Sequence, residues 1–249
     1  MASLTETERE AGFPYGDRTT ALIADLRARG VERFTLLMRH SAREYAAGRH
    51  DLANPLTDRG RALAREFGLR LPAELVLRAY ASPVARCEDT AELIHAGHLE
   101  IGGGGSGGCR PMEALGVFYV LDQMRMFKAM SVAREGLSTF VRNWMDGAVP
   151  EDIMMPAPLA ARTLLAALVS RLRGRPAADL PLLDLCVSHD LTLYLMREQL
   201  LGLHREQADV LYLDGLALWE SGGELLAATH DAEPMVITSL IARPTGVPS

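Results

Sequence analysis

The sequence has few cysteines. The three that it has, Cys87, Cys109 and Cys186, lie far apart along the chain. They form no CxxC pair, and their number is odd. A disulfide framework and a zinc site are therefore not expected, and a reducing compartment fits this cysteine usage better.

Long apolar runs are also missing. No stretch approaches the roughly 18 uninterrupted apolar residues that suggest a membrane-spanning helix. The beginning of the chain, MASLTETEREAG, has no apolar segment of the kind that a secretory signal needs. We therefore expect a cytoplasmic protein with no membrane partner and a flexible N-terminus over residues 1–16.

The chain has no excess of positive charge. Its net charge is −6, so neither nucleic acid nor an anionic membrane is an expected partner, although a local basic pocket remains compatible with this balance. The 249 residues, 48% hydrophobic and 23% charged, are ordinary for a soluble globular protein. We expect a single domain over residues 17–249.

Apolar periodicity and turn signals predict alternating strands and helices. Strands are expected at 34–38, 75–81 and 182–187, followed by a hairpin of 216–220 and 224–229. Helices are expected at 17–29, 59–70, 84–96, 157–173 and 190–203. This alternation predicts an α/β fold, a three-layer sandwich around a mostly parallel sheet.

An insertion is expected at about 100–156. It begins with GGGGSGG at 102–108, which lacks the Lys-Ser or Lys-Thr of a phosphate-binding P-loop and is predicted to be a flexible linker. The residues 118–146 that follow are rich in methionine and aromatic residues and broadly helical. We expect them to form a lid over a pocket, with simple packing against the core as the alternative.

Polar residues follow each of the three predicted core strands. Arg39-His40 comes after the first strand, Arg86 lies shortly after the second, and His189-Asp190 comes after the third. Ligands of parallel α/β sheets bind at the carboxyl ends of the strands, and the N-termini of the following helices favour an anion there. These residues are therefore predicted to form one site.

Arginines dominate this group. Planar guanidinium groups bind phosphate oxygens in pairs, which suits Arg39, Arg43 and Arg86 to a phosphate ligand better than lysines would be. Each arginine taken singly would be assigned to a surface salt bridge. Their shared position near strand ends favours an anion pocket instead.

Four segments together resemble the histidine phosphatase superfamily, which includes cofactor-dependent phosphoglycerate mutases and histidine acid phosphatases. The segments are LLMRHSARE, PLTDRGRALA, ASPVARCEDTAELI and CVSHDLTLYLM. They follow the order of the family and cover the core from about 34 to 203. The insertion and the C-terminal hairpin are not matched in detail.

The resemblance implies roles for four residues. The nucleophile of the family corresponds to His40, and the arginine beside it to Arg39. The arginine of the SPxxR segment corresponds to Arg86, and the second histidine of the pocket to His189. The resemblance thus places the same residues in a phosphate pocket as their strand-end positions do.

The acid phosphatase branch of the family extends this correspondence. It has an arginine three residues after the nucleophile, matched by Arg43, and a proton donor directly after the second histidine, matched by Asp190. The family usually has glycine where this chain has Ser41, whose side chain could narrow the pocket or donate its hydroxyl to the substrate. The mutase branch takes its proton donor from a glutamate for which Glu113 is the nearest candidate here.

The implied chemistry needs no metal and no cofactor, because the arginines supply the positive charge. A neutral His40 would attack phosphorus and expel an alcohol, which Asp190 could protonate if it is held protonated near the phosphate. His189 would stabilise the charge on the transferring group. Water would then hydrolyse the phosphohistidine.

We therefore expect a phosphomonoesterase that hydrolyses a small phosphorylated metabolite. The alternatives are a phosphoglycerate mutase-like phosphotransferase, a phosphatase acting on phosphoproteins, and a catalytically inactive protein that binds a phosphorylated ligand. The expected partner is a small-molecule phosphomonoester, and a homodimer is left open.

Overall fold

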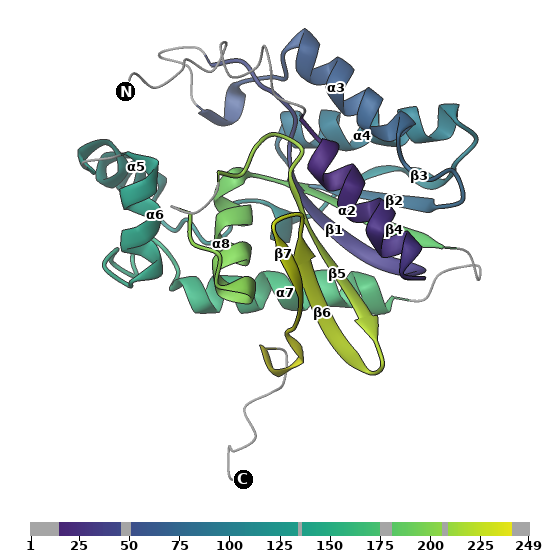
Figure 1. Ribbon diagram of the computed structural model, residues 1–249. Coiled ribbons are helices and arrows are strands. Elements are labelled where there is room, and N and C mark those ends of the chain that lie inside the picture. The colour runs from purple at the N-terminus through teal and green to yellow at the C-terminus, as the bar shows by residue number, and fades with distance from the viewer. Residues whose placement is uncertain (1–14, 46–50, 134–135, 175–180, 206–208, 241–249) are drawn as a thin grey trace.

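The computed structural model of the chain (Figure 1) describes residues 15–45, 51–133, 136–174, 181–205 and 209–240. The flexible start expected at residues 1–16 lies, up to residue 14, outside the described part of the chain. Within that part, no helix has both the length and the apolar character needed to cross a membrane.

A seven-stranded sheet forms the centre, in the order β3-β2-β4-β1-β5-β6-β7. The strands are β1 Arg33–Arg39, β2 Val76–Ala81, β3 Gly104–Pro111, β4 Leu182–Ser188, β5 Gly215–Ser221, β6 Glu224–Thr229 and β7 Ala232–Val236. The first four strands in the sheet order are parallel to one another, whereas β5, β6 and β7 pair antiparallel. The predicted mostly parallel sheet is thus confirmed.

Helices cover both faces of the sheet. They are α2 Asp17–Ala28, α3 Asp58–Leu69, α4 Ala85–Glu100, α5 Gln123–Val132, α6 Leu137–Met145, α7 Ala157–Arg173 and α8 Asp190–Leu201, with short 3-10 helices η1 Asp51–Ala53, η2 Glu113–Leu115 and η3 Thr238–Leu240. Helices α2, α3 and α4 pack on one face, and α7 and α8 pack on the other (Figure 1). The three layers are those that the sequence predicted.

Alternation along the strands explains why the sheet has two apolar faces. In β1, Phe34, Leu36 and Met38 join the core under α2 to α4, whereas Leu37 joins the core under α7 and α8. Successive side chains of a strand point to opposite faces, so a central strand that is apolar throughout contributes to both. The same holds for β4, in which every residue is buried.

The glycine stretch 102–108 is not a linker, and this prediction was wrong. Most of it forms the first part of β3, which pairs in parallel with β2 at the edge of the sheet. A side chain at Gly103 would overlap the imidazole of His98, and one at Gly105 would overlap His95. Glycine therefore lets α4 lie close to this strand. Glycine is rare in strands, which is why the sequence alone did not predict a strand here.

The insertion carries both core residues and the predicted lid helices. Helix α6 lies beside α8, and α5 packs against α6 (Figure 1). Tyr119 and Trp144 are buried and stacked with their ring centroids 5.0 Å apart, and the Tyr119 hydroxyl lies 2.8 Å from Thr192 Oγ1 of α8. These contacts agree with the alternative of core packing. A lid over the pocket stays a prediction.

Candidate active site

The carboxyl ends of β1, β2 and β4 bring three of the predicted residues into direct contact. Arg86 Nε donates to His40 Nε2 at 3.0 Å, and Arg86 Nη2 lies 3.4 Å from His189 Nδ1. The two imidazole rings have centroids 5.7 Å apart and meet edge to face. All three side chains are buried, so the site is a compact cluster with little exposure to solvent.

His40 is held as a neutral imidazole with a defined tautomer. Its Nδ1 lies 2.8 Å from the carbonyl oxygen of Ser41, which can only accept, so Nδ1 carries the proton and Nε2 carries the lone pair. Burial, followed by the charges of Arg86 and Arg39, lowers the pKa of His40 well below its usual value. The nitrogen that faces Arg86 therefore carries the lone pair that a nucleophile needs.

His189 is also neutral, and Ser82 orients it. A guanidinium can only donate, so the Nδ1 facing Arg86 accepts and Nε2–H donates to Ser82 Oγ at 3.0 Å. Burial and then Arg86 lower the pKa of His189 to about 4. We did not predict this role of Ser82, although its place between the second strand and Arg86 was a signal.

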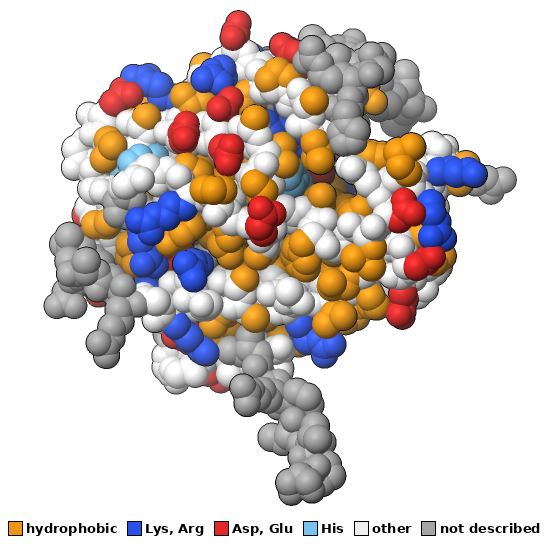
Figure 2. Space-filling model, turned by 180° about the vertical axis from the view of Figure 1, so that it is seen from behind, with side chains coloured by type: hydrophobic (Ala, Val, Ile, Leu, Met, Phe, Trp, Pro, Cys, Tyr) orange, Lys and Arg blue, Asp and Glu red, His pale blue; other side chains and the backbone are white. Residues whose placement is uncertain are grey.

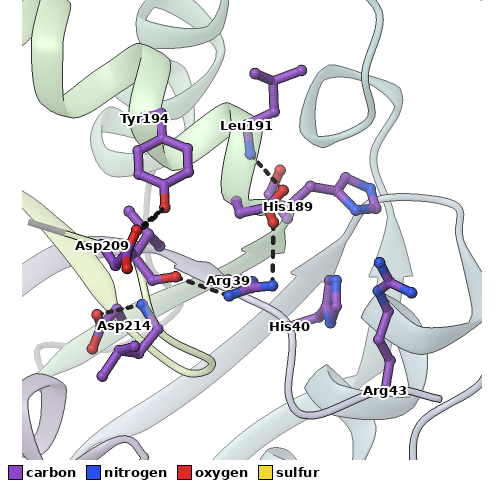
Figure 3. A network of polar contacts seen from close by, with 12 residues as sticks. Arg39, His40, Arg43, His189, Leu191, Tyr194, Asp209 and Asp214 are labelled. Atoms are coloured by element: carbon purple, nitrogen blue, oxygen red, sulfur yellow. Dashed lines mark hydrogen bonds and ion pairs between the residues drawn. The ribbon is translucent and has the colours of Figure 1, made fainter. Parts of the chain in front are cut away.

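Arg39 is fixed from several sides (Figure 3). Its Nη1 donates to the Val210 carbonyl at 2.8 Å, and its Nη2 pairs with Asp190 Oδ2 at 3.1 Å. The guanidinium lies over the Tyr212 ring, 4.0 Å from the centroid, and its backbone N–H donates to Asp214 O at 2.9 Å. The orientation of this arginine is therefore set by contacts within the protein.

The turn before β5 presents Tyr212 to Arg39. Leu211 N–H donates to Asp214 Oδ2 at 2.8 Å, and Asp214 N–H donates back to Leu211 O at 3.1 Å. Leu213 between them has a φ of 62°, in the left-handed region that few non-glycine residues adopt. Thr19 Oγ1 secures this residue by donating to its carbonyl at 2.7 Å. Sequence reasoning missed this turn.

Loss of the Tyr212 ring face is expected to weaken substrate binding. Tyr212→Leu should raise KM and the inhibition constant of inorganic phosphate by roughly 3- to 30-fold, since a stacked, desolvated cation contributes about 0.7–2 kcal/mol. Tyr212→Phe keeps the ring and should stay within about 3-fold of the wild type. Steady-state kinetics with phosphate as inhibitor measure both constants. Equal phosphate inhibition of Tyr212→Leu and wild type would contradict a positioning role.

The surroundings of Asp190 lower its pKa. Burial alone would raise its pKa, but Arg39 and the Leu191 N–H, which donates to Oδ1 at 2.7 Å, together lower the pKa below the usual value. The side chain is 32% exposed. An acid role for Asp190 therefore needs a bound phosphate that raises the pKa of the carboxyl, and this role stays a prediction.

Arg43 lies at the edge of the cluster. Its Nη1 donates to the Glu44 carbonyl at 3.1 Å, and its Cζ is 5.6 Å from the Tyr45 ring centroid. Figure 3 shows its guanidinium directed toward His189. Its positive charge contributes to lowering the pKa of His189. The structure thus places Arg43 near the other predicted residues but leaves its substrate-binding role a prediction.

Ser41 is tied to the neighbouring helices. Its hydroxyl donates to the Gly60 carbonyl at 2.7 Å, and its backbone N–H donates to Thr90 Oγ1 at 3.1 Å. A side chain at Gly60 would overlap the Ala42 carbonyl, so α3 packs tightly against the loop that carries His40. The hydroxyl proton is used in this contact. Substrate binding by Ser41 stays a prediction, and the geometry favours a role in positioning the loop.

Glu113 lies at the same edge of the sheet as the cluster. It begins η2, directly after β3, and is exposed. The carbonyl of Leu115 accepts from Ser188 Oγ at 2.6 Å, and a side chain at Gly116 would lie 3.7 Å from Ser82 Oγ. The path of the chain through β3, which the sequence did not reveal, thus brings the segment that follows Glu113 close to the site.

Comparison with known proteins supports the assignment. Residues 35–101 match the family model of the histidine phosphatase superfamily, branch 1. This segment contains the predicted nucleophile His40 as well as Arg39, Arg43 and Arg86. No curated protein matches the chain.

Solved structures share the fold over most of the chain. A mutant phosphoserine phosphatase from Entamoeba histolytica, in complex with phosphoserine, has 15% identity and a TM-score of 0.51, covering 80% of this chain and 96% of its own. YhfR from Bacillus stearothermophilus has 18% identity and a TM-score of 0.52, covering 80% and 98%. At this identity the likeness establishes the fold alone. The resemblance to the histidine phosphatase superfamily is thus confirmed, by the family match in the segment that carries His40 and by the shared fold.

Proposed function

We propose that this protein hydrolyses the phosphate monoester of a small metabolite through a phosphohistidine formed on His40. The observation that carries this proposal is the state of His40. Its Nε2 is deprotonated and faces Arg86, with the guanidinium of Arg39 and the imidazole of His189 close by. A neutral nucleophile within a positive, buried cluster suits attack on a phosphate dianion.

Ligand binding must first release the nucleophile. The Nε–H of Arg86 donates to the His40 lone pair that attacks phosphorus. Phosphate oxygens are stronger acceptors for a guanidinium than imidazole is, so a bound phosphate draws Arg86 away from Nε2. Arg86 then neutralises the phosphoryl group instead of masking the nucleophile.

In the first chemical step a bond forms between His40 Nε2 and phosphorus while the bond to the alcohol oxygen breaks. The Ser41 carbonyl, which accepts from Nδ1–H at 2.8 Å, stabilises the positive ring that results. The alcohol oxygen takes a proton from Asp190. In the second step water attacks phosphorus, its proton passes to the Asp190 carboxylate, and the bond from phosphorus to Nε2 breaks.

This scheme needs a protonated Asp190, and binding of the substrate phosphate favours that protonation. Arg39 holds the pKa of Asp190 down in the free protein. A bound dianion competes for Arg39 and adds negative charge nearby, and both effects raise the pKa of the carboxyl. Substrate binding is therefore expected to be accompanied by proton uptake.

Assays on the purified protein test the proposal. The protein with excess EDTA should release inorganic phosphate from nitrophenyl phosphate and from one or more members of a panel of metabolite phosphates, phosphoserine included. Arg86→Ala should lose this activity, whereas Arg162→Ala, an exposed arginine of α7, should keep it. Tight binding of phosphate esters without turnover would instead indicate a binding protein. Transfer of phosphate to a second metabolite would indicate a mutase.

A further inference from the structure

A second cavity lies on the face of the sheet that α7 covers. Its volume is about 290 Å³. Its walls come from the ends of β2 and β3 and from the last turns of α7, and include Tyr80, Arg110, Met112, Ser170 and Arg171. None of the residues assigned to phosphate chemistry lines it, so it is a separate feature of the described chain.

The two arginines of this cavity lack acidic partners. Within the described residues, neither Arg110 nor Arg171 forms an ion pair, and both are exposed. Most other exposed arginines pair with a carboxylate. Examples are Arg29, Arg61, Arg65, Arg125 and Arg173. The net charge of the chain is −6, so two arginines without an acidic partner at one cavity are unusual. Their positive charge favours the binding of an anion there.

Two further arginines, Arg78 and Arg33, lie next to Arg171 and add positive charge near the cavity. Arg78 donates to both carboxylate oxygens of the buried Asp184, at 2.6 and 2.7 Å, and to the Arg171 carbonyl at 3.1 Å. Arg33 also lies close, 3.4 Å from the same carbonyl, and its pKa is lowered by burial and by Arg78. The Asp184 carboxylate thus bonds Arg78, and within the described residues neither Arg33 nor Arg171 forms an ion pair. Figure 2 shows Arg and Lys side chains gathered on the left of the rear face.

The remaining walls are largely apolar. The Tyr80 ring is only 4% exposed and lies 5.8 Å from the Arg171 guanidinium, and Pro111 and Met112 flank it. A cavity of this size is at the small end of the range for ligand sites. It suits a molecule with one charged group and a short apolar part, and it is too small for a dinucleotide.

We propose that this cavity binds a small organic oxyanion, with the charged group held by Arg110 and Arg171 and the apolar part against Tyr80 and Met112. Ser170 also lines the cavity. This binding does not depend on the proposed hydrolysis, because it uses none of the same side chains.

Phenylphosphonate is a suitable probe, since it combines a ring with a dianion and its carbon–phosphorus bond resists hydrolysis. Isothermal titration of the wild-type protein should give two sites. Arg86→Ala should remove the site at His40 and leave one. In that background, Arg171→Ala and Arg110→Ala should each weaken the remaining site at least about 10-fold, the equivalent of one lost charged hydrogen bond.

Arg162→Ala provides the matched control, since Arg162 is also an exposed arginine of α7 with no ion pair among the described residues, but it does not line the cavity. It should change the affinity less than 2-fold in the Arg86→Ala background. Thermal melting of each variant confirms folding. A single site that disappears with Arg86→Ala, or equal effects of Arg171→Ala and Arg162→Ala, would overturn the proposal. An inactive wild type that still shows the second site would refute the hydrolysis alone.

Discussion

Replacement of His40 by alanine is expected to reduce turnover by about 10⁴-fold or more, because it removes the atom that forms the intermediate. The imidazole is buried, and its Nδ1 bonds the neighbouring Ser41 carbonyl, so folding must be checked by circular dichroism. His95→Ala is the matched control. His95 is a mostly buried histidine on α4 that faces the glycine strand instead of the site, and its loss should leave kcat within a few-fold.

A trapping experiment separates nucleophilic catalysis from a merely structural need for His40. Rapid quenching with a ³²P-labelled substrate should give a labelled protein whose phosphate is stable in base and labile in acid, as phosphohistidine is. Peptide mapping should place the label on His40. Label on a serine, or normal turnover by His40→Ala, would exclude the mechanism.

Replacement of Asp190 by asparagine should slow hydrolysis of an alkyl phosphate by roughly 10²–10⁴-fold, the usual contribution of a general acid. The same change should affect nitrophenyl phosphate much less in kcat, because that leaving group needs little protonation. Asp190 also pairs with Arg39 at 3.1 Å, so KM is expected to rise for both substrates. The ratio of kcat values for the two substrates therefore separates the effect of losing the proton donor from the effect of losing the ion pair with Arg39.

Glu113→Gln is the paired experiment. Glu113 begins η2 beside the segment that carries Ser82, but it is exposed. We expect little change in kcat for either substrate. A large, leaving-group-dependent loss in Glu113→Gln, with little in Asp190→Asn, would assign the donor to Glu113 and reopen the choice between hydrolase and mutase.

Sequence reasoning located the site because its residues follow buried strands. The apolar runs before Arg39, Ser82 and His189 identify strands, and parallel strands end at one edge of a sheet. No further information was needed to expect His40, Arg86 and His189 together. Their contacts, with Arg86 between the two imidazoles, follow from packing that no local pattern encodes.

The features that were missed depend on partners distant in sequence. The position of Tyr212 depends on the left-handed backbone of Leu213, the next residue. Thr19, far away in the chain, holds Leu213 by a hydrogen bond to its carbonyl. The lowered pKa of Asp190 depends on Arg39, which ends the neighbouring strand β1. The glycine strand could not be recognised because glycine disfavours strands, and only the imidazoles of α4 explain its use there.

Both edges of the sheet resist extension by another strand. At one edge, Gly107 and Gly108 have φ values of 72° and 75°, and the pairing of β3 with β2 slips between Leu77 and Ala79. At the other edge, the short β7 contains Pro234, which has no N–H to donate. Bulges and prolines of this kind interrupt the row of backbone groups that a second chain would need. Edge-to-edge aggregation is therefore disfavoured, and a homodimer would have to associate through helices and loops.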